Sequence, residues 1–381
     1  MNKFCLLLLI LIMALTFTSC EYQDLDKTLF ITAIVIDKGE QEGTMNIYYE
    51  AYRPSASSAQ EKAEGERIIY GVKDADIMEA SDKLNELSNL SVSYSQTKTL
   101  LFTRAAAEQG LDLYVNLWNH STDFTIRTYL GIWDAEPEEI ENIELKGEQF
   151  LGVYLRTHIN NSEKNTSHVN VVTMLDLMNA AAIKDKVITL PVIRPIKQEK
   201  TQLIDLPGVA LIRNYKMAGE LPAARTSFLL YMNNTIKKDF IATENPDAKG
   251  TDVVLITMSS DVDTIIKPQN ERMVITKYVN SSTLLRGSQK TFVVDDWSIN
   301  TIEKNMNEEF EKNCLALYKE YASQGLDIYN LGESIYREYP WFDQKDLFKK
   351  IDFKVKADFK IDGTNYKFDF NTTIKHKKPN R

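Results

Sequence analysis

The sequence predicts an α+β protein of mixed α/β character with three domains, each a mainly antiparallel or mixed β-sheet with packed helices. Three observations lead to this expectation. Strand-like runs rich in β-branched and aromatic residues alternate with amphipathic helical stretches. A long helical pattern near the C-terminus is followed by two runs of alternating polarity. The chain has 381 residues, 43% hydrophobic and 26% charged, which suits a globular protein with more than one core.

The expected boundaries follow changes in composition and apolar spacing along the chain. Residues 1–19 read as a removable signal peptide, and residues 20–28 as a modified cysteine with a polar tether. An N-terminal α/β domain is expected over 29–200, a small middle domain over 201–262, and a C-terminal α/β domain over 263–381.

The N-terminal segment has the pattern of an export signal. Lys3 precedes an apolar run from Phe4 to Phe17 that is short for a spanning helix. The run ends in small residues followed by Cys20, an ending that resembles a bacterial lipobox. We therefore predict cleavage between Ser19 and Cys20 and attachment of lipid to the Cys20 thiol. The alternative is an ordinary signal peptide that happens to contain a cysteine.

Charge and cysteine usage restrict the class of protein. The net charge of −9 becomes −10 once Lys3 leaves with the signal, which argues against nucleic acid as a partner. Cys5 would leave too and Cys20 would carry lipid, so Cys314 stays unpaired and no disulfide is expected. Cys314 shares helical spacing with apolar residues, which predicts a buried position rather than a reactive thiol. Those residues are Ile302, Met306, Phe310, Leu317 and Tyr321.

In the first half, strands and helices are expected in mixed order. Expected strands are Leu29–Asp37, Met45–Tyr52, Arg67–Val72, Thr99–Phe102 and Phe124–Trp133. Expected helices begin behind Asp74 as N-cap and cover Ala105–Trp118, Phe150–His158 and Val171–Ala182. The stretch from Val187 to Ile196 contains Pro191 and Pro195, which suits an edge strand or a connector.

In the second half, a short helix is expected behind Pro222, followed by several strands. The longest helix should run from Asp295 to Ser323 and end before Gly325. Two shorter helices and a terminal β-hairpin should follow. The helices are Leu326–Tyr339 and Trp341–Lys349, and the hairpin strands are Ile351–Ile361 and Tyr366–Ile374.

Catalytic motifs are missing from the sequence, so we expect neither an enzyme nor a cofactor. There is no glycine-rich phosphate loop, no Gly-x-Ser-x-Gly, no His-Glu-x-x-His and no Cys-x-x-Cys. His158 and His168 flank a polar stretch that makes poor scaffolding for a metal. Asp261 and Asp263 should share one strand face, where a solvated surface competes with paired catalytic carboxylates.

Two segments could form contact surfaces. The aromatic corner Tyr339-Pro340-Trp341-Phe342 could anchor a partner, although closure over a core requires the same residues, and we favour core. The basic tail from Lys375 to Arg381 could lie on anionic headgroups or be a frayed end.

Four stretches behind Cys20 resemble one known family. They are Leu29–Asp37, Lys98–Leu111, Leu206–Leu221 and Leu326–Pro340. In this order they resemble the C-subunit lipoproteins of bacterial spore germinant receptors, the Ger(x)C family.

The resemblance implies a fold of three mixed α/β domains and a protein without enzymatic activity. It implies a lipoprotein on the outer face of the spore inner membrane that assembles with integral membrane A and B type subunits in a nutrient receptor. We expect the unlipidated body to be monomeric. Two alternatives remain: a solute-binding lipoprotein of a transporter, with two βαβ-rich lobes around a cleft, and an enzyme of the cell envelope.

Overall fold

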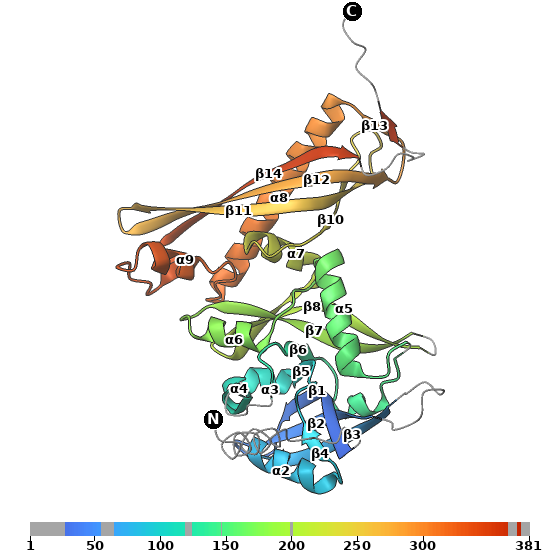
Figure 1. Cartoon of the computed structure of the whole chain (residues 1–381). Coiled ribbons are helices and arrows are strands. Elements are labelled where there is room, and N and C mark those ends of the chain that lie inside the picture. Colours follow the sequence, from blue (N-terminus) through green and yellow to red (C-terminus); the bar gives the residue numbers. More distant parts are fainter. Residues whose placement is uncertain are drawn as a thin grey trace, which may run out of the picture.

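The computed structural model describes residues 27–54, 65–118, 124–145, 147–198, 201–364 and 372–374. The predicted signal, Ser19, Cys20 and the basic tail lie outside these residues. The described chain is of mixed α/β class, as predicted, with sheets of mixed strand orientation. Its two large sheets lie toward opposite ends of the molecule, with helix α7 between them (Figure 1).

Within the described residues, the first sheet has nine strands in the order β3-β2-β1-β5-β6-β7-β8-β9, with β4 beside β1. Strands β1, β5, β6 and β7 are parallel, while β2 and β3 on one side and β8 and β9 on the other are antiparallel. The strands are β1 (Thr28–Lys38), β2 (Met45–Arg53), β3 (Glu66–Ala75), β4 (Ser91–Ser93), β5 (Thr99–Thr103), β6 (Tyr129–Trp133), β7 (Val187–Gln198), β8 (Thr201–Arg213) and β9 (Lys216–Pro222).

Helices cover both faces of the parallel part, which explains why its strands are almost continuously apolar. Helix α5 (Leu151–Asn165) packs on the face that carries Val35 and Leu101. Four helices pack on the opposite face, which carries Ile34 and Leu100. They are α2 (Ile77–Leu87), α3 (Arg104–Gln109), α4 (Asp112–Trp118) and α6 (Met174–Ala181). A 3-10 turn, Pro137–Asn142, contacts β1 and β2.

The second sheet has the order β10-β11-β12-β14, and β14 runs parallel to β12. Its strands are β10 (Phe240–Glu244), β11 (Asp252–Gln269), β12 (Arg272–Ser288) and β14 (Ile351–Thr364). Helix α8 (Asp296–Ser323) packs along one face through the predicted row from Ile302 to Tyr321, all of it buried. Asp295 caps the helix by accepting from the Ser298 amide at 3.0 Å. The predicted long helix is confirmed.

The remaining elements connect or flank the two sheets. Helix α7 (Ala223–Met232) joins β9 to β10, and α9 (Leu331–Glu338) follows α8. A 3-10 turn, Leu347–Lys349, precedes β14. Two short parallel strands, β13 (Phe292–Val294) and β15 (Thr372–Ile374), form a third sheet. No helix in the described part of the chain combines the length and apolar character needed to span a bilayer.

The predicted terminal hairpin is wrong. β14 pairs with β12, not with the strand that follows it, and β15 pairs with β13. The alternating pattern identified the strand, but pairing is decided by the crossover through α8, which returns the chain parallel to β12.

Three smaller expectations also differ from the structure. The N-cap of α2 is Asp76, not Asp74, since Asp74 has a positive φ at the end of β3. Strand β7 lies inside the sheet rather than at its edge, yet it pairs with β6 at just Val192 and Ile193, next to Pro191. The two helices after α8 are shorter than expected. Strands β7 and β8, which lie on either side of the expected boundary between residues 200 and 201, pair within one sheet, and the three-domain division stays a prediction.

Candidate functional site

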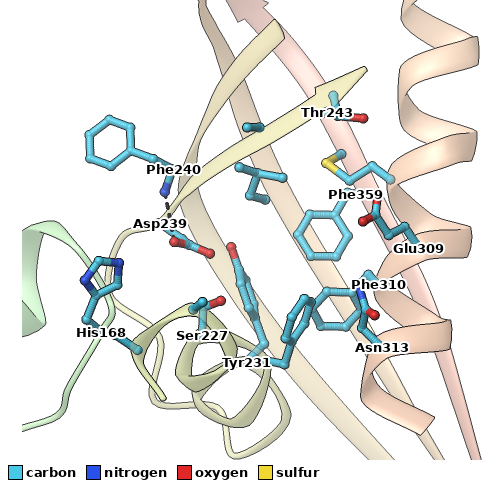
Figure 2. Close-up of a pocket in the computed structure, with 16 residues that line it drawn as sticks. His168, Ser227, Tyr231, Asp239, Phe240, Thr243, Glu309, Phe310, Asn313 and Phe359 are labelled. Atoms are coloured by element: carbon cyan, nitrogen blue, oxygen red, sulfur yellow. Dashed lines mark hydrogen bonds between the residues drawn. The ribbon is translucent and has the colours of Figure 1, made fainter. Parts of the chain in front are cut away.

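A cavity of about 310 Å³ lies where α7, β10 and α8 meet (Figure 2). Ser227, Phe228 and Tyr231 line it from α7, and Glu309 and Phe310 line it from α8. The other walls come from the start of β10, from Phe359 of β14, and from the segment between α5 and α6 at His168. The cavity therefore sits at the junction between the two sheets, a common location for ligand sites.

Local sequence explains how α7 reaches this position. Pro222 ends β9 and stands directly before the helix, where its missing amide hydrogen costs no hydrogen bond. The helix is held by the buried side chains of Leu229, Leu230 and Met232. Ser227 and Tyr231 line the cavity. The Ser167 hydroxyl donates to the Lys238 carbonyl, which fixes the α5–α6 segment against the chain that enters β10.

Asp239 is the most buried carboxylate in the cavity wall, at 9% exposure. Its Oδ1 accepts a hydrogen bond from the Phe240 amide at 2.9 Å, and the hydroxyls of Ser227 and Tyr231 also hydrogen-bond the carboxylate. Burial raises the pKa of Asp239 to about 6, because these three donors offset only part of the desolvation cost.

The apolar wall is aromatic. The Phe310 ring lies 5.7 Å from that of Phe228, 5.3 Å edge-on from that of Tyr231 and 4.9 Å from that of Phe359. The Tyr231 hydroxyl lies within hydrogen-bonding distance of Thr257 Oγ1, and burial raises the pKa of Tyr231 far above its usual value. The rings thus form a fixed surface beside the Asp239 carboxylate, which suits binding rather than catalysis.

A metal is not indicated at this cavity. In the ranges that the structure describes, no three His, Cys, Asp or Glu side chains come together as a metal site. His168 is exposed at the cavity mouth, and the other histidine of that segment, His158, packs beside Tyr154 in α5.

A second buried polar group lies in the core between α8 and β12. Lys277 Nζ donates to the carbonyls of Met232 at 2.6 Å and Tyr329 at 3.3 Å. Burial lowers its pKa to about 8, opposed by the charge of Asp327. Asp327 Oδ2 accepts from the Gly332 amide at 2.7 Å, but its Oδ1 has no partner among the described residues. Burial raises the pKa of Asp327.

The amino ends of the parallel strands carry a third feature, which we name the amino-end patch: Lys98, Ile126, Arg127, Arg156 and Leu175. Lys98 directly precedes β5, Arg127 lies two residues before β6, and Leu175 donates its amide to the Ile126 carbonyl at 3.0 Å. Ile126 is 48% exposed and Leu175 40%. Burial and the nearby charge of Arg156 lower the pKa of Lys98. Arg127 and Arg156 are exposed, so the patch combines positive charge with exposed apolar surface.

The structure separates the residues that the sequence singled out. Asp261 and Asp263 are exposed on β11, as expected of a solvated strand face. Cys314 is a free, buried thiol, as predicted, and burial raises its pKa.

The aromatic corner divides between core and surface. Tyr339 and Phe342 pack against the core, which confirms that interpretation for both. Trp341 is 70% exposed, so the core interpretation is wrong for that residue.

Sequence reasoning missed Asp239 and the cavity. The lining residues extend from His168 to Phe359 and come from five separate segments, so no local pattern joins them. The one available signal was that Asp239 stands directly before Phe240, the first residue of a strand.

Two protein-family models match consecutive parts of the chain. Residues 21–195 match a family model described as "Spore germination protein N-terminal domain". Residues 207–365 match "Spore germination B3/ GerAC like, C-terminal". Together the two models cover most of the chain, with the N-terminal model first and the C-terminal model second.

The chain belongs to the Ger(x)C family of spore germination proteins, homologous to germinant receptor C subunits. It is similar to "Spore germination protein KC" of Bacillus subtilis (strain 168), with 23% identity over 407 positions that cover 99% of each chain. Its fold is similar to that in "Crystal Structure of the GerBC protein", with a TM-score of 0.51, 16% identity, and coverage of 86% of this chain and 96% of the other.

Proposed function

We propose that this protein is a membrane-anchored lipoprotein subunit of a nutrient germinant receptor, on the outer face of the spore inner membrane. It acts by docking with integral membrane A and B type subunits rather than by catalysis. The observation that carries the proposal is the match of both family models across the body that follows Cys20.

The geometry supports an anchor at this end. From Cys20 to Lys27, seven residues of extended chain span at most about 25 Å. The tether therefore keeps the start of β1 near the bilayer surface. β5 and β6 are parallel to β1, so their amino ends lie at the same edge of the sheet.

The amino-end patch fits this orientation. Basic side chains near an anionic lipid surface contribute about 1 kcal/mol each, and exposed apolar residues can insert at the headgroup level. The body as a whole is acidic, so this local patch, and not the net charge, would attract it to the membrane. A lipid anchor would confine the protein to the membrane plane beside its partners and raise their effective concentration. Each docking surface therefore needs to contribute little affinity.

The two sheets differ in size and strand order, which supports this proposal over a solute-binding lipoprotein with two similar lobes.

The anchor is tested by acyl labelling in spores. Cys20→Ala should abolish incorporation of a labelled fatty acid and leave unprocessed or released protein, while Cys314→Ala, a buried thiol, should leave labelling intact. Normal labelling of the Cys20 variant would exclude the lipid anchor.

The receptor role is tested by deletion of the gene. The deletion should abolish germination with one class of nutrients and leave other germination routes working. An unchanged nutrient response, in a strain without a redundant receptor, would contradict the receptor assignment.

A further inference from the structure

The cavity between α7, β10 and α8 combines negative charge with aromatic walls. Asp239 is buried in its wall, and Glu309 lines it from α8. The carboxylate of Asp239 is stabilised by one amide and two hydroxyl groups, with no Lys or Arg among its described interactions. His168 is the basic side chain among the described residues that line the cavity (Figure 2), and it is exposed to solvent.

We propose that this cavity binds a small organic cation, a primary ammonium group on an apolar body. Asp239 accepts hydrogen bonds from the ammonium, and the rings of Phe228, Phe310 and Tyr231 contact the apolar part. No comparison or sequence feature assigns a ligand to this position, and the inference holds whether or not the chain docks with membrane subunits.

Size and chemistry support this class of ligand. A cavity of about 310 Å³ is at the small end of the range for ligand pockets, which suits a compact molecule. A buried carboxylate without a cationic partner gains most from a ligand that brings the missing charge. Aromatic faces attract cations, by about 0.5–2 kcal/mol for each well-placed ring.

Two features near the site favour an anion, but both are weaker. Lys238 and Arg286 lie over the Phe240 ring, 5.7 Å and 5.3 Å from its centroid, and neither of these two side chains lines the cavity. Ala223 and Ala224, at the start of α7, also line the cavity, and a helix N-terminus carries about half a positive charge. Two carboxylates outweigh this partial charge. An uncharged or anionic ligand of the same shape should therefore bind less well.

Binding should depend on pH through Asp239. Since burial raises its pKa to about 6, the carboxyl group is protonated in most molecules at pH 5 and ionised at pH 7.5. The other titratable groups facing it are Tyr231 from α7, Glu309 from α8 and His168 from the α5–α6 segment. Protonation of His168 would also disfavour a cation at low pH, so the pH step must be compared with that of a variant without Asp239.

The experiment is calorimetric titration of the full-length protein in detergent micelles with benzylammonium chloride at pH 7.5. We expect saturable binding, and about tenfold weaker binding of benzyl alcohol, which has the same shape without the charge. Equal binding of the two compounds, or no binding of either, would overturn the proposal.

Variants locate the site. Asp239→Asn should weaken benzylammonium binding about tenfold and remove most of the loss seen between pH 7.5 and 5. Asp263→Asn, on an exposed strand face, is the matched control and should bind normally. Ser227→Leu fills the cavity without removing a charge, although it removes one hydroxyl donor to Asp239. It should abolish binding, which decides the question if Asp239→Asn folds poorly. Full affinity in a folded Ser227→Leu protein would place the cation elsewhere and contradict the proposal.

Discussion

The regions around the two large sheets differ in how fully their buried charged side chains are hydrogen-bonded. In the first sheet, Glu50 of β2 is completely buried, at 0% exposure, and each carboxylate oxygen has two strong donors. Oε1 accepts from Arg67 Nε at 2.7 Å and the Leu151 amide at 2.7 Å. Oε2 accepts from Thr32 Oγ1 at 2.6 Å and the Gly152 amide at 2.9 Å.

These donors make Glu50 the cap of α5. Leu151 and Gly152 are the first two residues of that helix, so the carboxylate satisfies amides that have no intrahelical partner. Gly152 allows this close contact, since a Cβ atom there would lie 2.1 Å from the Thr32 carbonyl oxygen. The charge thus fixes α5 on β1 and β2.

Around the second sheet, the buried charges are less completely compensated. Asp239 has no basic partner among its described interactions, and Asp327 leaves Oδ1 without a partner in the described chain. Lys277 is held by two carbonyl groups. The difference suggests that the first region uses charge to fix its structure, while the second keeps charges whose protonation can change.

The largest expected effect is at Glu50. Glu50→Gln keeps the shape but turns an NH₂ group toward donors, so the free energy of unfolding should fall by about 3–5 kcal/mol. The measurement is the midpoint of guanidinium denaturation. Glu79→Gln, which removes an exposed ion pair with Lys83, should change stability by less than about 0.5 kcal/mol. Equal effects of the two variants would remove the contrast between the sheets.

The next effect is at Asp239, where substitution should raise the free energy of unfolding instead of lowering it. Its folded-state pKa of about 6 lies above the unfolded value, so its contribution to stability is present below pH 4 and lost as pH rises through 6. Asp239→Asn should match the parent at pH 4 and be about 1–3 kcal/mol more stable at pH 7. Thermal unfolding from pH 4 to 7.5 measures this. A variant that is less stable at pH 7 would show that the carboxylate is structural, like Glu50.

Lys277 should give an effect of the same order that grows with pH. Lys277→Met leaves the Met232 and Tyr329 carbonyls without their donor, which costs about 1–3 kcal/mol. Because the folded-state pKa of about 8 lies below the unfolded value, the parent gains stability relative to the variant from pH 8 to 10. Denaturation curves at pH 7 and 10 test this. A difference that is constant with pH would show that Lys277 does not titrate in the folded protein.

How much the sequence could predict depends on how local the cause is. Asp295, the apolar row through Cys314, and Gly325 define α8 within one segment, and the structure reproduces them. Strand β14 was also visible from its alternation. The pairing of β14 with β12 could not be predicted from the sequence, because it depends on a crossover of more than sixty residues.

Buried charges are harder still to foresee. Glu50, Asp239 and Lys277 are charged, and charged residues usually face water. Their burial follows from the packing of α5, α7 and α8 on the strands. The sequence therefore indicated the class of fold and the family, but not the cavity.

The smallest effect concerns the edge of the second sheet. Helix α8 covers the outer edge of β14 with a ladder of side chains. The amides of Ala357, Phe359 and Ile361 donate to Glu311 at 3.0 Å, Asn307 at 2.8 Å and Glu303 at 2.9 Å. These acceptors are one helical turn apart and follow the alternate outward amides of the strand. An edge covered in this way cannot pair with another chain.

Asn307→Ala removes the middle rung of this ladder. It should cost about 1 kcal/mol and speed hydrogen exchange of the Phe359 amide roughly fivefold. Asn305→Ala, two residues earlier on the exposed side of α8, is the control and should leave that amide unchanged. Unlike Glu50, Asn307 is neutral and half-buried, so its loss leaves no unpaired charge. Exchange that is equally slow in both variants would mean that packing of α8, not the hydrogen bond, protects the edge.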